Sequence, residues 1–209
     1  ERLDAGERDL EVEGSIAKFY ATEAGNRAAE DSIQALGGYG YIAEYGVEKI
    51  KRDVRITTIY EGTREIQQNI ISTFRWKKSR KTKGEFYGAM AAEMEQLAEA
   101  YPDCGSHYVG LAARALNHLI AFADIHRLTR QQIIMFNLAD MMIHVEIGAA
   151  AARRAAALAP AGGPPAERAA LVARLFADEM CQVFTRNIPR ILIGTGEIEP
   201  ETVANSLAE

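Results

Sequence analysis

Apolar residues recur at helical spacing along most of the chain. The first run extends from Val12 through Ile16 to Leu36, where Gly37 and Gly38 interrupt it. A repeat at i, i+3 and i+4 predicts an amphipathic helix, and paired glycines are typical of a helix end. We therefore expect a long helix that stops before Gly37.

The residues after this helix carry mixed signals. Gly37–Gly46 is rich in glycine and predicts a loop, whereas Val47–Val54 predicts a short basic helix. Val54–Tyr60 contains β-branched residues in alternation and favours a strand by propensity. We still expect a short helix and a turn there, because a lone strand in a helical chain has nothing to pair with.

A further helix is expected from Thr63, with Ile66, Ile70 and Phe74 on one apolar stripe. It runs into the segment Arg75–Lys83, which contains six cationic side chains. This basic segment predicts a solvated connecting face. Contact with an anionic ligand, a lipid or a partner is the alternative.

Four more apolar stripes occupy the second part of the chain. They are Phe86–Tyr101, ended by Pro102; Leu111–Ile125, capped by Ser106; Ile134–Val145, capped by Thr129 with Gln132; and Val172–Phe184, preceded by the turn Gly162–Pro165. Four helices joined by short links are typical of an antiparallel bundle. The expected fold is all-α, with one helical domain at 1–75 and an additional helical domain at 76–209.

Composition narrows the class of protein. With 48% hydrophobic and 25% charged residues among 209, the chain is typical of a soluble globular protein. A net charge of -5 gives no reason to expect nucleic acid, and no uninterrupted apolar stretch approaches the roughly 18 residues of a membrane span. Cys104 and Cys181 are far apart and predict reduced, packed thiols in a cytosol-like compartment. We expect a cytoplasmic, bacterial protein. Because the sequence opens with Glu1, we expect it to be the end of a longer polypeptide.

Four histidines raise the question of a metal site. The two on one predicted helix, His118 and His126, lie eight residues apart, which is too far for both to bind one ion. No carboxylate pattern completes a site around them. We expect no metal.

One stretch of the sequence contains a specific motif. Gln34–Glu44 is followed by Lys49 and Asp53, and then by Ile59–Thr63, which reads Ile-Tyr-Glu-Gly-Thr. In this order the segments resemble the C-terminal signature of the flavin-dependent acyl-CoA dehydrogenases. The resemblance runs from about Gly14 to Ile71 and implies that family's C-terminal helical domain.

The resemblance also implies roles for single residues. It makes Glu61 the catalytic base; Tyr60 and Gly62 substrate-binding residues beside the thioester; and Gln34, Gly37, Gly38, Thr63 and Glu65 contacts to FAD. The segment around Gln34 contacts the FAD of a neighbouring subunit in this family. Local sequence alone favours Glu61 as a cap for the helix that follows, and Gly37 with Gly38 as a helix stop. The whole signature reverses this interpretation of Glu61.

The implied reaction is the α,β-dehydrogenation of an acyl-CoA thioester to a trans-2-enoyl-CoA. A carboxylate performs the proton abstraction well when it is shielded from water, so we expect Glu61 in a dry pocket. The implied partners are acyl-CoA, an electron-transfer flavoprotein and further copies of the chain in a dimer or tetramer. Alone, the 209 residues are expected to bind FAD weakly or not at all and to be inactive.

Two other interpretations remain open. One is an acyl-CoA oxidase of the same fold. The other is a helical interaction module without catalysis, in which Glu61 is buried in a salt bridge.

Overall fold

The computed structural model describes residues 4–194, 196, 198–199 and 201–202. Within these residues every regular element is an α-helix or a 3-10 helix, and none is a strand. This confirms the predicted all-α fold, including the choice of helix and turn over the β-branched Val54–Tyr60. The internal contacts divide the chain into two compact units, unit 1 (residues 1–71) and unit 2 (residues 72–209). The predicted domains 1–75 and 76–209 rest on the sequence signature and stay a prediction.

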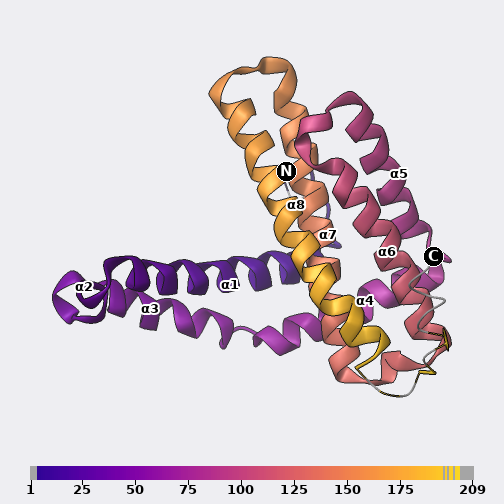
Figure 1. The fold of residues 1–209 in the computed structure, drawn as a ribbon, viewed down its shortest axis with the longest axis horizontal. Helices are drawn as coiled ribbons and strands as arrows, with labels where there is room; N and C mark the ends of the chain where they lie inside the picture. The colour runs from indigo at the N-terminus through magenta and orange to yellow at the C-terminus, as the bar shows by residue number, and fades with distance from the viewer. Residues whose placement is uncertain (1–3, 195, 197, 200, 203–209) are drawn as a thin grey trace. The chain divides into compact units, whose positions relative to one another are not determined.

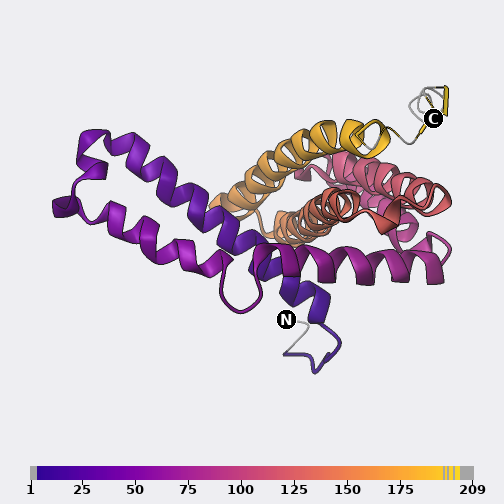
Figure 2. The same ribbon diagram turned by 90° about the horizontal axis from the view of Figure 1, so that it is seen from below.

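Unit 1 consists of a long helix and a shorter one that returns along it. Its elements are α1 (Glu11–Leu36), α2 (Gly38–Tyr41), η1 (Ala43–Tyr45), α3 (Val47–Arg55), η2 (Ile56–Thr58) and the beginning of α4 (Arg64–Lys81). α1 and α3 lie side by side and run in opposite directions (Figures 1 and 2). The prediction of a plain loop at Gly37–Gly46 is wrong, because two short helices form within it.

α4 buries polar residues on the side that the sequence pattern does not mark. Ile66 and Phe74 are 50% and 46% exposed, whereas Gln67, Gln68 and Ser72 are buried. The predicted inward stripe is therefore wrong at Ile66 and Phe74. A polar face can be buried where its groups find hydrogen bonds, and Gln67 finds them in unit 1.

Unit 2 is an antiparallel bundle that follows the last turns of α4. Its elements are α5 (Glu85–Ala100), η3 (Pro102–Cys104), α6 (Ser106–Ile125), η4 (Leu128–Arg130), α7 (Gln132–Leu158), η5 (Ala159–Ala161) and α8 (Gly163–Leu192). α5 packs on α6, and α7 packs on α8 (Figure 2). The second helical bundle predicted from the four apolar stripes is confirmed.

α7 is the core helix of this bundle. Leu138, Met141, Met142 and Val145 are fully buried, as the sequence predicts. Each such side chain contributes roughly 1.5–3 kcal/mol relative to an exposed one. By length and composition, residues 132–161 are apolar enough to cross a membrane, yet 67% of the most apolar window is buried inside the protein. Packing within the bundle accounts for this apolarity.

The predicted inward faces of α6 and α8 are partly wrong. Leu111, Ile125, Val172 and Leu175 are exposed. The buried face of α6 contains several alanines, including Ala112, Ala113 and Ala123. Alanine contributes little to a hydrophobic pattern, so the larger apolar side chains pointed to the wrong face.

The predicted caps of α6 and α7 are also wrong. Gly105 and Gln131 occupy the N-cap positions, without a side-chain cap from either. Ser106 lies inside the first turn and is fully buried. Gly105 adopts a φ of +72°, and a Cβ there would lie 3.1 Å from the carbonyl oxygen of Ala173, so packing against α8 selects glycine at this position.

The basic segment Arg75–Lys83 continues α4 and is only partly solvated. The Arg75 side chain is buried and donates two hydrogen bonds of 2.7 Å to Glu146 of α7, from Nε and Nη2. The Tyr87 hydroxyl donates to the same carboxylate at 3.0 Å. The prediction of a solvated connecting face is therefore wrong at Arg75. Burial, with the Glu146 charge as a second cause, raises the pKa of Tyr87 well above its ordinary value of 10.0.

Candidate active site

The residues Tyr60 to Thr63 form a tight turn between η2 and α4. Glu61 has a φ of +54° and Gly62 has a φ of +83°. Glycine adopts this left-handed region freely, whereas a glutamate does so at a cost of about 1–3 kcal/mol. Such a conformation persists only where the surroundings hold it in place.

Two side chains hold this turn through its backbone. Lys18 of α1 donates from Nζ to the carbonyl oxygen of Gly62 at 2.6 Å. Gln67 of α4 donates from Nε2 to the carbonyl oxygens of Glu61 and Gly62 at 3.2 and 3.4 Å. Because both carbonyls are bound, the Glu61 side chain leaves the turn from a fixed point.

The φ of Gly62 favours glycine at this position. A Cβ atom there would also lie 2.6 Å from Nε2 of Gln67, so the end of the Gln67 side chain would have to shift. The next residue, Thr63, accepts a hydrogen bond of 3.3 Å from the Ile66 backbone N–H through its hydroxyl oxygen. Thr63 thus caps α4, and the alternative in which Glu61 serves as the cap has no support in this geometry.

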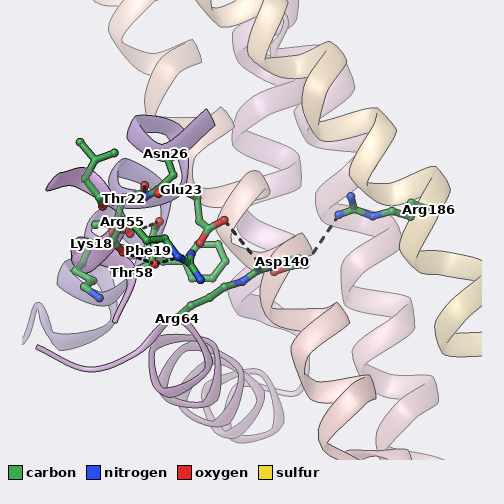
Figure 3. Close-up of polar contacts among 11 residues, drawn as sticks. Lys18, Phe19, Thr22, Glu23, Asn26, Arg55, Thr58, Arg64, Asp140 and Arg186 are labelled. Atoms are coloured by element: carbon green, nitrogen blue, oxygen red, sulfur yellow. Dashed lines mark hydrogen bonds and ion pairs between the residues drawn. The ribbon is translucent and has the colours of Figure 1, made fainter. Parts of the chain in front are cut away.

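The turn rests on a polar seam between α1 and α3. Asn26 donates from Nδ2 to the carbonyl oxygen of Val54 at 3.0 Å, and Lys51 donates to the carbonyl oxygen of Asn26 at 3.0 Å. Arg55 then donates to the Thr58 hydroxyl at 3.1 Å, a bond that spans η2 (Figure 3). The seam explains how the β-branched stretch before Glu61 folds into helix and turn.

Arg64 connects the beginning of α4 to α1. Its guanidinium lies 3.6 Å from the Glu23 carboxylate and 5.6 Å from the centre of the Phe19 ring (Figure 3). The ion pair is partly exposed, so its contribution to stability is about 1 kcal/mol or less.

Glu61 and Tyr60 are both exposed. Because Glu61 is exposed, the described residues do not form the dry pocket expected around it. The described residues also give Glu61 no ion pair, so the buried salt bridge expected of a non-catalytic module is not formed among them either. Thr63 and Glu65 lie beside the same turn, at the start of α4.

The glycine-rich segment lies elsewhere in unit 1. Gln34 follows Lys18 by sixteen positions on α1, about 24 Å at 1.5 Å per residue. Gln34, Gly37 and Gly38 are exposed, and Gly37 ends α1 with a φ of +58°. The structure therefore separates the expected FAD contacts into two groups, one at the far end of α1 and one beside Glu61.

Sequence reasoning missed the residues that hold the site. Lys18 and Asn26 lie on α1 among other polar residues, and no local motif marks either of them. Gln67 belongs to the recognised signature, but its part in holding the turn follows only from the fold. Asn26 also has a buried Oδ1 atom without a hydrogen-bond partner among the described residues.

A comparison with protein families supports this assignment of the fold. The family described as "Acyl-CoA dehydrogenase, C-terminal domain" matches residues 1–74 and 90–197, and so includes most of both units.

Two relatives match about a third of the chain. An acyl-CoA dehydrogenase of Bacillus subtilis is 52% identical over 62 residues, which cover 30% of this chain and 16% of that protein. The caffeyl-CoA reductase-Etf complex subunit CarC of Acetobacterium woodii is 53% identical over 66 residues, covering 32% of this chain and 17% of that protein. The chain thus spans less than a fifth of the length of either relative.

A solved structure extends the likeness to both units. An acyl-CoA dehydrogenase from Bacillus anthracis, complexed with FAD, aligns with a TM-score of 0.76 over 94% of this chain and 35% of that one. At 22% identity this similarity establishes the fold alone. Together with the family match over most of the sequence, it shows that the chain belongs to the acyl-CoA dehydrogenase family and carries that family's C-terminal helical domain.

Proposed function

We propose that this chain forms the base-bearing side of a flavin-dependent acyl-CoA dehydrogenase active site. Glu61 takes the proton from the carbon next to the thioester carbonyl, while Tyr60 and Gly62 line the thioester. FAD, when bound, accepts the hydride that leaves the neighbouring carbon, so the product is a trans-2-enoyl-CoA. The left-handed backbone of Glu61, held through bonds from Lys18 and Gln67, is the observation that supports this most.

The physical reason for this proposal is that the backbone holds the Glu61 carboxylate in a fixed position. Proton abstraction gains from a base that is held at one point relative to the reacting carbon. Strained residues cluster at functional sites, and the strain at Glu61 serves no capping role because Thr63 caps α4. A carboxylate fixed in this way and otherwise unpaired among the described residues is suited to act on a ligand.

Shielding of this base needs further atoms. Glu61 is exposed among these residues, whereas an effective carboxylate base is removed from water. We infer that the acyl-CoA thioester, the flavin ring and protein beyond these 209 residues together enclose it. The small share of each relative's length that the chain spans is consistent with this.

The FAD contacts fit one side of a flavin site. The Gln34 amide and the glycine backbone after it are exposed, and the Thr63 hydroxyl keeps its proton for donation while its oxygen caps α4. Because the two groups lie about 24 Å apart along α1, we propose that they contact different FAD molecules in a dimer or tetramer. An electron-transfer flavoprotein is the proposed electron acceptor in a cytoplasmic enzyme, since a relative is named as a subunit of an Etf complex.

A chimera tests the role of Glu61. Residues 14–71 of this chain replace the matching segment of the Bacillus subtilis acyl-CoA dehydrogenase, and flavin reduction by acyl-CoA is followed without oxygen. Glu61→Gln is expected to slow flavin reduction by about 100-fold or more, because a positioned base contributes that much. Acyl-CoA binding, measured by its effect on the flavin spectrum, is expected to persist.

Glu48→Gln is the matched control. It removes a carboxylate from the same segment, where Glu48 pairs with Arg52 on the surface of α3. Reduction is expected at the parent rate in this variant. Equal rates for Glu61→Gln and the parent chimera would assign the base to another residue.

A further inference from the structure

Unit 2 contains a cavity at the end of the basic segment. It is partly open to solvent and has a volume of about 320 Å³ where α4 passes into α5, against the side of α6. Its polar side chains come from Ser79, Arg80, Lys83, Asn117, His118 and Asp124, and Gly84 lies beside them. None of these residues belongs to the candidate active site.

The charge of the lining is positive. Asp124 is its acid, and this carboxylate already accepts a hydrogen bond from the Trp76 indole at 3.2 Å and pairs with Arg80 at 3.3 Å. Arg80 also stacks over the Trp76 ring, 5.3 Å from its centre, so its guanidinium is held in place. The ammonium of Lys83 has no acidic partner among the described residues and leaves the cavity with excess positive charge.

Lys83 holds a backbone conformation that favours glycine. Its φ is +51°, and its N–H donates to the carbonyl oxygen of Arg80 while Gly84 donates to that of Ser79. This is the hydrogen-bond pattern of a Schellman helix end, where glycine is the usual left-handed residue. A lysine there costs stability, and Lys78 and Lys81 already supply positive charge to the helix end. The strain at Lys83 is explained if its ammonium group binds a ligand in the cavity.

Asn117 presents an unsatisfied group at the same place. Its Oδ1 atom is buried without a hydrogen-bond partner among the described residues. A Cβ on Gly84 would lie 3.0 Å from both terminal atoms of this amide, so the chain passes close beside it. A buried acceptor without a donor is unfavourable, and a bound ligand with a hydroxyl or amino group would satisfy it.

We propose that this cavity binds a small phosphate monoester. A phosphate carries nearly two negative charges and three acceptor oxygens, which match Lys83, Arg80 and the imidazole of His118. The group esterified to it donates a hydrogen bond to Asn117. The volume lies at the lower end of the range for ligand sites, which admits a sugar phosphate or a nucleoside monophosphate and excludes a whole FAD or coenzyme A.

Titration calorimetry of the 209-residue chain tests the proposal, with inorganic phosphate, ribose 5-phosphate and AMP as probes. Both esters are expected to bind more tightly than inorganic phosphate, because only they donate to Asn117. Lys83→Gly is the decisive variant, since glycine keeps the backbone conformation and removes the charge. It is expected to weaken ester binding at least about tenfold while raising the thermal midpoint.

Two further variants separate the cavity from the general basic surface. Lys77→Gln removes a charge from the same helix without touching the lining, and is expected to change ester affinity less than about twofold. Ala121→Phe fills the cavity without changing charge and is expected to abolish ester binding. Absence of ester binding at millimolar concentration, equal affinity for esters and inorganic phosphate, or equal loss in Lys77→Gln and Lys83→Gly would each overturn the proposal.

Discussion

The buried ion pair between Arg75 and Glu146 allows a quantitative test of how α4 is held in unit 2. Arg75 is 4% exposed, and its guanidinium makes two hydrogen bonds to the Glu146 carboxylate. Glu146→Gln leaves the guanidinium buried opposite a neutral amide. Removing one partner of a buried pair costs about 3–5 kcal/mol, because the remaining buried charge loses a charged partner. At about 2–4 °C per kcal/mol for chains of this size, the thermal midpoint should fall by roughly 6–20 °C.

An exposed pair of the same geometry provides the control. Arg153 donates to Glu93 with bonds of 2.6 and 2.7 Å, but both side chains are almost half exposed. Glu93→Gln should therefore cost less than about 1 kcal/mol. The double variant Arg75→Met with Glu146→Leu removes both charges together, and its cost should be well below the sum of the single costs.

Urea unfolding followed by tryptophan fluorescence measures these differences. Trp76 is the single tryptophan of the chain, and it lies next to Arg75 with its indole bound to Asp124. Its emission therefore reports the unfolding of unit 2. Equal losses for Glu146→Gln and Glu93→Gln, or additive costs in the double variant, would refute the reasoning that burial makes this pair important.

Three further predictions follow from particular contacts. The raised pKa of Tyr87 means that the folded protein retains a proton that the unfolded chain loses near pH 10. The contribution of Tyr87 to stability should therefore be full below pH 10 and fall as the pH rises. Tyr87→Phe should reduce this fall in alkaline urea titrations. Gly62→Ala should destabilise unit 1 by about 1–3 kcal/mol in circular dichroism melts, whereas Gly25→Ala, with open space around it inside α1, should stabilise by about 0.5–1 kcal/mol. The purified 209-residue chain should carry no stoichiometric flavin by absorbance, because the described residues provide only one side of the site; a full complement of bound FAD would contradict this.

The fold was predictable where large apolar residues mark the buried side. The stripe on α7 predicted its buried side chains, and Gly37 marked the end of α1. Prediction failed on α6, where alanines form much of the buried face, and on α4, where Gln67 and Arg75 are buried. On α6 the hydrophobic pattern fails because alanine adds little to it. On α4 it fails because a polar group with a hydrogen-bond partner can be buried at small cost.

The candidate site shows a similar division. The Glu-Gly-Thr order of the turn can be recognised in the sequence, because it stands in fixed order after the glycine-rich segment and the charged residues of the signature. The two side chains that hold the turn, Lys18 and Gln67, cannot be identified from the sequence in this role. Lys18 lies 44 positions before Gly62, and no local motif links the two residues. Propensity alone would also argue against a glutamate at a φ of +54°. The strain at Glu61 becomes intelligible only with both clamping side chains in place, and for that reason Lys18 and Gln67 belong to the functional description of this turn as much as the carboxylate does.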